Sequence, residues 1–264
     1  MKAYSEDINE EYVTKMIEAN REFLRADLWA EWKLRDMQTP QRRGEPAPPL
    51  QKPYASDATL IDLVSADDFT VGDMPLIEAI KQRKSRREYT EAALTLEELS
   101  FLLWTMQGVH DIIRDGVATT RTVPSGGARH PFETYLYISR VEGLTQGLYR
   151  YLPLSHQLCV VSTRPDLKDS IYVACLQPFV KDAAVVVIWA VIPYRTEWRY
   201  SFLAHKVIAQ ETGHICQNLY LACESIGAGA CALGTYDQEA LDSLLGLDGD
   251  EEFAIYVAPV GKVV

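Results

Sequence analysis

The strongest candidate for chemistry in this sequence is a basic segment, Arg83-Lys84-Ser85-Arg86-Arg87. Four cations in five residues need a reason in a chain whose formal net charge is -11. Guanidinium groups and a hydroxyl suit a phosphate, because their donors match its acceptor oxygens. The segment therefore predicts a polyanion site, and the alternative is a solvated helix end where cations complement the helix dipole.

A second candidate is the bare loop Pro124–Gly127 (PSGG), which precedes ETYLYIS, an alternating stretch that predicts a strand. Glycine lets a backbone approach a flat or anionic ligand closely, with its N–H groups exposed. A tight turn also needs glycine, so these residues alone leave a ligand loop and a plain turn both open. Arg129 and His130 follow the loop, and the sequence assigns them no role.

Other motifs are missing or stand in the wrong context. GAGACALG, from Gly227, follows a helix and opens a strand, which is the reverse of a Rossmann fingerprint. Glu211 and His214 form one Glu-x-x-His pair, whereas a di-iron bundle needs two, so a polar pair inside a helix interface is the simpler interpretation. We expect no metal site, and no nucleophile elbow or P-loop supports a hydrolase or an NTPase.

Composition limits the partners and the compartment. A pI near 5.0 argues against nucleic acid or an anionic membrane as a partner. The N-terminal MKAYSEDINEEY has no apolar signal region, and the run AAVVVIWAVI is far below the ~20 residues of a membrane span. Five cysteines without a Cys-x-x-Cys pair indicate buried, reduced thiols, so we expect a cytoplasmic protein.

Residues 1–73 predict an appendage to a main domain over 74–264. Apolar residues recur at helical spacing over about 9–36 and predict one helix. Four of the 13 prolines then fall between Pro46 and Pro53, which indicates an extended arm. A lone helix on such an arm must dock either on its own core or on a partner subunit.

The main domain alternates helices and strands without strict βαβ order, which favours an α+β fold. We expect a helix before the basic segment, and a second one from the capping box Thr95-x-x-Glu98 to Gly108. GLYRYLP and HQLCVVS predict an antiparallel pair, and a helix over 166–175 precedes a buried strand over 183–192. The longest helix is expected over 198–226, followed by a short strand, a helix (DQEALDSLLGL) and a final strand (EFAIYVAPVG).

In this order the segments resemble the FMN-dependent nitroreductase family over about 75–262. The basic segment matches the family's Arg-Arg-Ser-x-Arg type motif, with Lys84 in a position that is often Arg or His. PSGGARHPFETYLYI, VEGLTQGLYRY, ETGHICQNLYLACESIGAG, ALGTYDQEALDSLLGL and YVAPVGK are similar to its SagB-type branch, which includes azoline oxidases. The resemblance implies a central mixed or antiparallel sheet surrounded by helices, with a long central helix, in a homodimer that holds FMN at its interface.

By position, the resemblance assigns FMN contacts to three parts of the chain. The phosphate and the ribityl or pyrimidine edge would meet Arg83, Lys84, Ser85, Arg87 and, from the C-terminal end, Lys262. The other subunit would reach the flavin through Pro124, Ser125, Gly126 and Gly127. The long helix would contribute Gln210, while Leu233 and Gly234 would lie beside the reactive N5 with a backbone N–H near it.

Two departures from the family bear on the reaction. Azoline oxidases of this branch carry Lys-Tyr ahead of the long helix, where this chain has the candidate catalytic pair Arg199-Tyr200; arginine is a poor general base. Leu233 stands where simple nitroreductases often have Glu, which changes the charge near the flavin edge.

The resemblance favours an FMN oxidoreductase that passes hydride from NAD(P)H to a small aromatic, quinone or nitro acceptor. The alternatives are a SagB-type dehydrogenase that oxidises azoline rings in a peptide, and a flavin-binding scaffold subunit without turnover.

Overall fold

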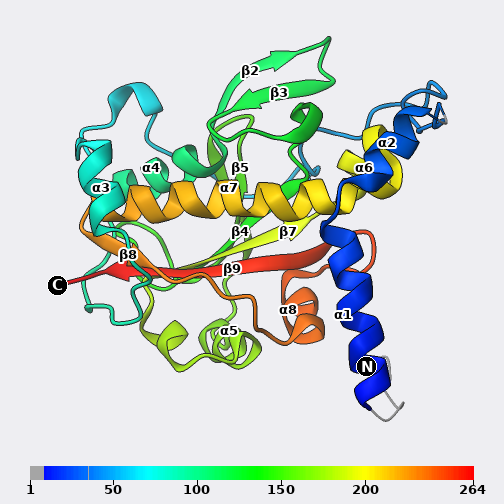
Figure 1. The fold of residues 1–264 in the computed structure, drawn as a ribbon. Coiled ribbons are helices and arrows are strands. Elements are labelled where there is room, and N and C mark those ends of the chain that lie inside the picture. The colour runs from blue at the N-terminus through cyan, green and yellow to red at the C-terminus, as the bar shows by residue number, and fades with distance from the viewer. Residues whose placement is uncertain (1–8, 35) are drawn as a thin grey trace.

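A seven-stranded sheet forms the centre of the computed structural model, which describes residues 9–34 and 36–264 (Figure 1). The strand order is β1-β6-β5-β4-β7-β9-β8, and the ladders between neighbours are antiparallel. The strands are β1 (Leu60–Asp62), β4 (Phe132–Ile138), β5 (Gly147–Leu152), β6 (Gln157–Ser162), β7 (Val185–Val191), β8 (Ala228–Ala230) and β9 (Phe253–Lys262). The predicted pairing of GLYRYLP with HQLCVVS is confirmed as the β5–β6 ladder.

The middle strands β4 and β7 are buried along their whole length. Because alternate side chains of a strand point to opposite faces, each strand serves two cores. Val187 and Trp189 join the apolar cluster on one face, whereas Val186 and Ile188 join the cluster on the other. This double burial explains why the sequence there is an unbroken apolar run.

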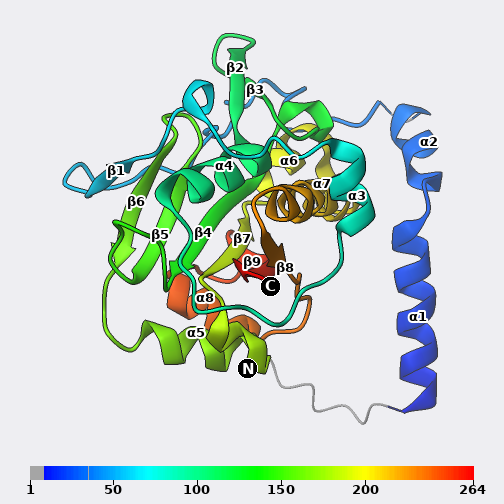
Figure 2. The same ribbon diagram turned by 90° about the vertical axis from the view of Figure 1, so that its left-hand side faces the viewer.

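Helices cover both faces of the sheet (Figures 1 and 2). One face carries α4 (Leu96–Gln107) and α7 (Ala204–Ser225), with α3 (Leu76–Gln82) against α7, and the other carries α5 (Leu167–Cys175) and α8 (Gln238–Leu245). The expected capping box is confirmed: Thr95 Oγ1 accepts from Glu98 N at 3.1 Å, and Glu98 Oε2 accepts from Thr95 N at 2.9 Å. Gly108 ends α4, also as predicted.

The expected start of the longest helix is wrong. Residues Tyr194–Tyr200 form a separate helix, α6, which ends where Ser201 adopts φ 50°. After a short 3-10 turn (Ser201–Leu203), α7 begins at Ala204. Apolar side chains continue across this corner, so the helical periodicity gave no sign of the break.

The expected single N-terminal helix is also two helices, α1 (Glu10–Leu24) and α2 (Asp27–Leu34). The backbone of Arg25 is extended, with ψ 165°, and its Nε donates to Asp27 Oδ2 at 2.5 Å. Both views show α1 standing away from the body of the protein (Figures 1 and 2).

The Pro-rich arm lies on the core and is held there by buried charged residues. Arg121 Nη2 donates to the carbonyl of Leu50 at 3.3 Å, and Arg150 Nη2 donates to that of Pro53 at 3.0 Å. Glu133 accepts from the backbone N–H of Lys52 at 2.7 Å. Prolines cannot join a ladder, so these side chains supply the partners that the arm's backbone needs.

Two further features were not predicted from the sequence. The arm ends in strand β1, which adds to the edge of the sheet against β6. A hairpin of β2 (Val109–Ile113) and β3 (Ala118–Arg121) projects between α4 and the PSGG loop. All five cysteines are buried and unpaired, as expected, and none of the described helices combines the length and apolarity needed to cross a membrane.

Candidate functional site

The basic segment is a loop that begins where α3 ends, with Arg83 as the helix C-cap. It runs past the C-terminal end of α7 and the edge of the sheet: Lys84 N donates to Glu224 Oε1 at 3.4 Å, and Arg86 N donates to the carbonyl of Ala230 at 2.9 Å. Residues 84–88 and 263–264 line a depression of about 480 Å³ beside it. Lys84, Arg86 and Arg87 therefore line a hollow, whereas Arg83 caps the end of α3.

The four cations have different surroundings. Arg86 is paired with the buried carboxylate of Glu224 at 3.0 Å, so it anchors the loop. The guanidinium of Arg83 lies 5.5 Å from the ring centre of Tyr220, and that of Arg87 lies 5.9 Å from the ring of Phe179. Over 9–34 and 36–264, no carboxylate forms a salt bridge with Arg83, Lys84 or Arg87. Lys84 and Arg87 thus line the depression, together with the carboxylate of Glu88, while Arg83 lies next to Lys84 at the end of α3.

Tyr220 on α7 is a central residue of this site that the sequence reasoning missed. Its hydroxyl lies 3.2 Å from Ser85 Oγ and accepts from the backbone N–H of Ala232 at 2.8 Å. It therefore ties the basic loop to the segment that contains Gly234. The available signal was spacing, because Tyr220 and Glu224 are one turn apart on α7 and both contact the basic loop.

Leu233 and Gly234 follow directly, and they differ in what they can offer a ligand. The side chain of Leu233 is 7% exposed and packs in the apolar cluster shared with α8, while its N–H donates to the carbonyl of Val257 at 2.7 Å. Gly234 is exposed, and a Cβ there would meet nothing within 4 Å. The open backbone at this edge is that of Gly234.

The ammonium of Lys262 is engaged within the chain. It pairs with Glu98 Oε1 at the start of α4 and donates to the carbonyl of Ile226 at 2.6 Å, at the end of α7. A cation at a helix C-terminus satisfies unpaired carbonyls and complements the helix dipole. Lys262 thus fastens two helix ends to β9, and its contact with a phosphate stays a prediction.

The PSGG loop lies near the other end of α7, and packing within the chain accounts for its glycines. Gly127 has φ 65°, and a Cβ on it would lie 2.5 Å from Arg199 Cδ. A Cβ on Gly126 would lie 2.7 Å from Val207 Cγ1. Pro124 is exposed, and its carbonyl accepts from His214 Nδ1 at 3.3 Å.

The side chains of Arg199 and Tyr200 pack against the two glycines of this loop. Arg199 Nε donates to the hydroxyl of Tyr200 at 3.2 Å, and its Nη1 donates to Gln41 Oε1 of the N-terminal arm at 3.1 Å. Arg199 is therefore held between the loop and the arm. In this arrangement it is a donor and a positive charge, not a proton acceptor.

Glu211, which the sequence suggested to be part of a polar pair with His214, instead contacts the PSGG loop. Its Oε1 accepts from Gly126 N at 2.5 Å, whereas its Oε2 is buried and has no partner among the described residues. Burial raises the pKa of this carboxyl to about 7, although hydrogen bonds from Gly126 and Ser125 act in the opposite direction. The loop therefore rests on a carboxyl that titrates near neutral pH.

Arg129 and His130, whose roles were open, anchor the same loop. Arg129 Nε donates to the carbonyl of Arg195 at 2.8 Å, and its guanidinium lies 4.9 Å from the ring centre of Trp198. His130 N donates to Ser125 Oγ at 2.9 Å. Burial, with Arg121 nearby, lowers the pKa of His130 to about 3, so its ring is neutral.

One chain does not bring the predicted residues together. Glu211 and Tyr220, the α7 contacts of the PSGG loop and the basic loop, are nine residues apart, or about 14 Å along the helix at 1.5 Å per residue. The α7 residues Gln210, Gly213 and Gln217, which lie between the two ends, are exposed. The two parts of the predicted site therefore lie at opposite ends of a partly uncovered helix.

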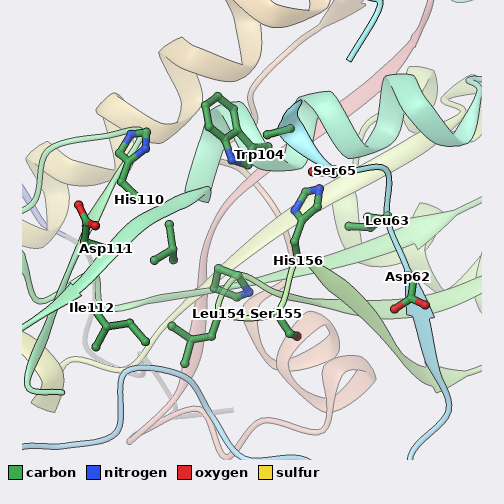
Figure 3. Close-up of a pocket in the computed structure, with 13 residues that line it drawn as sticks. Asp62, Leu63, Ser65, Trp104, His110, Asp111, Ile112, Leu154, Ser155 and His156 are labelled. Carbon is green, nitrogen blue, oxygen red and sulfur yellow. The ribbon is translucent and has the colours of Figure 1, made fainter. Parts of the chain in front are cut away.

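A separate hollow of about 600 Å³ lies between the β2–β3 hairpin and the β5–β6 turn (Figure 3). Its lining includes Trp104, His110 and the carboxylates of Asp62 and Asp111. Both ring nitrogens of His156 there are hydrogen-bonded within the chain, Nδ1 to the hydroxyl of Tyr151 at 2.8 Å and Nε2 to the carbonyl of Val64 at 2.9 Å. Two carboxylates and no Lys or Arg make this hollow unsuitable for an anionic cofactor.

The family model described as "Nitroreductase family" matches residues 80–262. A candidate nitroreductase of Methanocaldococcus jannaschii is 32% identical over 197 residues, which cover 72% of this chain and 96% of that protein. The chain belongs to the nitroreductase family.

Solved structures agree with this fold. A candidate nitroreductase from Ralstonia eutropha has a TM-score of 0.64 at 26% identity, over 83% of this chain and 99% of that one. A chain of the E. coli microcin synthetase McbBCD complex has a TM-score of 0.58 at 20% identity, over 92% and 94%, which is a likeness of fold alone. The expected nitroreductase-like α+β fold, with a mostly antiparallel sheet, is confirmed.

Proposed function

We propose that this chain is an FMN-dependent oxidoreductase that takes hydride from NAD(P)H and passes it to a small aromatic, quinone or nitro acceptor. The observation that carries the proposal is the set of three cations, Arg83, Lys84 and Arg87, that form no salt bridge with a described carboxylate. Like charges held close together repel one another, so such a cluster favours an anion between them. A phosphate monoester, with close to two negative charges and several acceptor oxygens, matches the cluster.

The residues around the depression fit the rest of FMN as well. Ser85 and Tyr220 present hydroxyls beside the cations, and Tyr220 also fixes Ala232 ahead of the bare backbone of Gly234. In the proposal, Arg83, Lys84, Ser85 and Arg87 hold the phosphate and the polar edge, and the Gly234 backbone lies along the ring. FMN supplies the redox chemistry, and the protein supplies binding, orientation and access.

The second part of the proposal is a homodimer. The PSGG loop lies about 14 Å from the basic loop along α7, too far to complete the same site from the same chain. A two-fold axis across the middle of α7 would bring each end of one helix to the opposite end of the other. Ser125–Gly127 of one subunit would then face the flavin bound by its partner, with Gln210 and Gly213 at the interface.

Arg199 favours the reductase over azoline oxidation. A base that removes a ring proton must accept it, whereas the guanidinium of Arg199 acts as a donor to both Tyr200 and Gln41. Hydride transfer needs no such base in the protein. In the proposal, Arg199 and Tyr200 border the acceptor site and position the loop.

The test begins with the purified full-length chain. We expect a visible flavin spectrum, FMN as the cofactor released on denaturation, and anaerobic bleaching by NADH or NADPH that a nitroaromatic or a quinone reverses. A bound flavin that neither nicotinamide bleaches would refute the proposed electron donor. A colourless protein that also fails to bind added FMN would refute the enzyme altogether, and a coloured protein without any turnover would indicate the scaffold role.

A further inference from the structure

Helix α1 carries an apolar stripe that the described residues of its own chain leave exposed. Val13, Met16, Ile17 and Leu24 recur at the spacing of one helix face, and each is at least 42% exposed. No residue of α1 is buried. A 15-residue helix is marginal in water by itself, so this stripe implies a surface on which α1 packs.

Among the described residues, the hydrogen bonds that hold α1 to the body of the protein lie at its C-terminal end. Lys206 Nζ donates to the carbonyls of Leu24 and Arg25, and just beyond α1 Trp29 packs edge-on against Tyr200 with ring centres 5.7 Å apart. From this attachment at the start of α7, the helix extends away from the body (Figures 1 and 2). This attachment therefore fixes the position of the C-terminal end of α1. It leaves the apolar stripe of the helix exposed among the described residues.

A complementary surface lies on α3. Leu76, Ile77 and Ile80 are between 52% and 65% exposed on this short helix. A groove of about 230 Å³, which Leu76 lines with Phe101 and Leu221 among others, continues the apolar surface between α3, α4 and α7.

The charges of the two surfaces are also complementary. Helix α1 has four acidic and two basic residues, whereas 76–87 has one acidic and five basic residues. Opposite charges at the edge of an apolar contact favour its formation and fix its orientation. An acidic, apolar helix thus matches a basic, apolar one.

The chain's own α3 is not in reach of its own α1. Helix α3 packs at the C-terminal end of α7, whereas Lys206 holds the end of α1 near the N-terminal end (Figure 1). Lys206 and Tyr220 are 14 residues apart, which corresponds to about 21 Å along the helix. An antiparallel arrangement of two α7 helices would put the α3 of a second copy at the end where α1 is attached.

We propose that α1 docks on a second copy of this chain, with its Val13–Leu24 stripe against α3 and the adjoining groove of that copy. This rests on the homodimer of the proposed function and adds to it an exchanged N-terminal helix. Helix α1 of each subunit then packs on the other subunit beside its basic loop. The contact is reciprocal, so a dimer contains two of them.

A double cysteine variant, Ile17→Cys with Ile77→Cys in the full chain, tests this contact with a short bis-maleimide. The five native cysteines are buried, which keeps the background low. We expect a covalent dimer on denaturing gels. Glu18→Cys with Ile77→Cys is the matched control, because residue 18 lies on the opposite side of α1 from the stripe, and it should give little product.

Each other outcome overturns the inference in a distinguishable way. An internally cross-linked monomer would mean that α1 folds onto its own chain. A dimer by light scattering with no Ile17-specific cross-link would refute the α1 contact and leave the proposed dimer intact, whereas a monomer by light scattering would refute both. As a second measurement, Ile17→Asp should raise the dimer dissociation constant at least about tenfold, and Glu18→Asn should not.

Discussion

The buried carboxylate of Glu211 accepts the backbone N–H of Gly126 at 2.5 Å, and this contact joins the PSGG loop to the central helix. It links a loop that contains two consecutive glycines to an α7 carboxyl whose pKa burial raises to about 7. The stability of the loop should therefore depend on pH near neutrality, where most carboxyls do not titrate.

The first prediction concerns that dependence. The folded pKa of Glu211 is above the ordinary value of 4.5, so the protonated form is favoured by folding. This stabilisation is fully present below about pH 4.5 and is lost as the pH rises through about 7. We expect the free energy of unfolding of the wild type to fall by about 3 kcal/mol relative to Glu211→Gln between these limits.

Urea unfolding of both proteins at pH 5 and pH 8 measures this difference. The amide of Gln can still accept from Gly126, so the comparison isolates the charge. Parallel pH profiles for the two proteins would contradict the raised pKa.

Gly127 provides a second prediction, about packing. Its φ of 65° and the 2.5 Å approach of a Cβ to Arg199 Cδ both oppose a side chain. Gly127→Ala should destabilise the protein by about 2–4 kcal/mol, from left-handed strain of about 1 kcal/mol and a forced shift of Arg199.

Gly143→Ala is the matched control, because Gly143 also has a positive φ, 78°, but a Cβ there meets nothing within 4 Å. It should lose only about 1 kcal/mol. If thermal unfolding showed the same loss of stability for the two variants, the close approach to Arg199 would add nothing to the cost of the left-handed strain.

The third prediction tests the phosphate site. Arg83→Ala should weaken FMN binding by about 1.5–3 kcal/mol, the range for hydrogen bonds to a charged group, with little change in stability. Flavin fluorescence titration of the apoprotein measures the affinity. Arg164→Ala removes an exposed arginine near α5 and should leave it unchanged. An unaltered affinity in Arg83→Ala would mean that the phosphate is bound elsewhere.

Lys262 should behave differently from Arg83. Its replacement by Ala leaves the carboxylate of Glu98 and the carbonyl of Ile226 without their partner. Because the pair is only partly exposed, we expect a loss of about 1–3 kcal/mol in the free energy of unfolding. Chemical denaturation of the apoprotein measures it. A fully stable variant that had lost only FMN affinity would assign Lys262 to the phosphate instead.

Local patterns in the sequence were sufficient for much of the fold. Alternation along ETYLYIS and the unbroken run at 183–192 gave β4 and β7, because each side chain of a strand faces one of two sides. The Thr95–Glu98 box gave the start of α4, because the cap is satisfied within four residues. The basic segment and the PSGG loop stood out by composition, and their order along the chain pointed to the nitroreductase family.

Tertiary structure decided the rest, because it depends on contacts between residues far apart in sequence. The corner at Ser201 that separates α6 from α7 has no glycine or proline to mark it. Tyr220 became a site residue only because α7 places it beside Ser85, 135 positions earlier. The carboxyl of Glu211 and the ammonium of Lys262 received their partners in the same way, from a loop and a helix end that no local pattern connects to them. The sequence by itself determined which groups could bind an anion, and only the folded chain decided which of them remain free to do so.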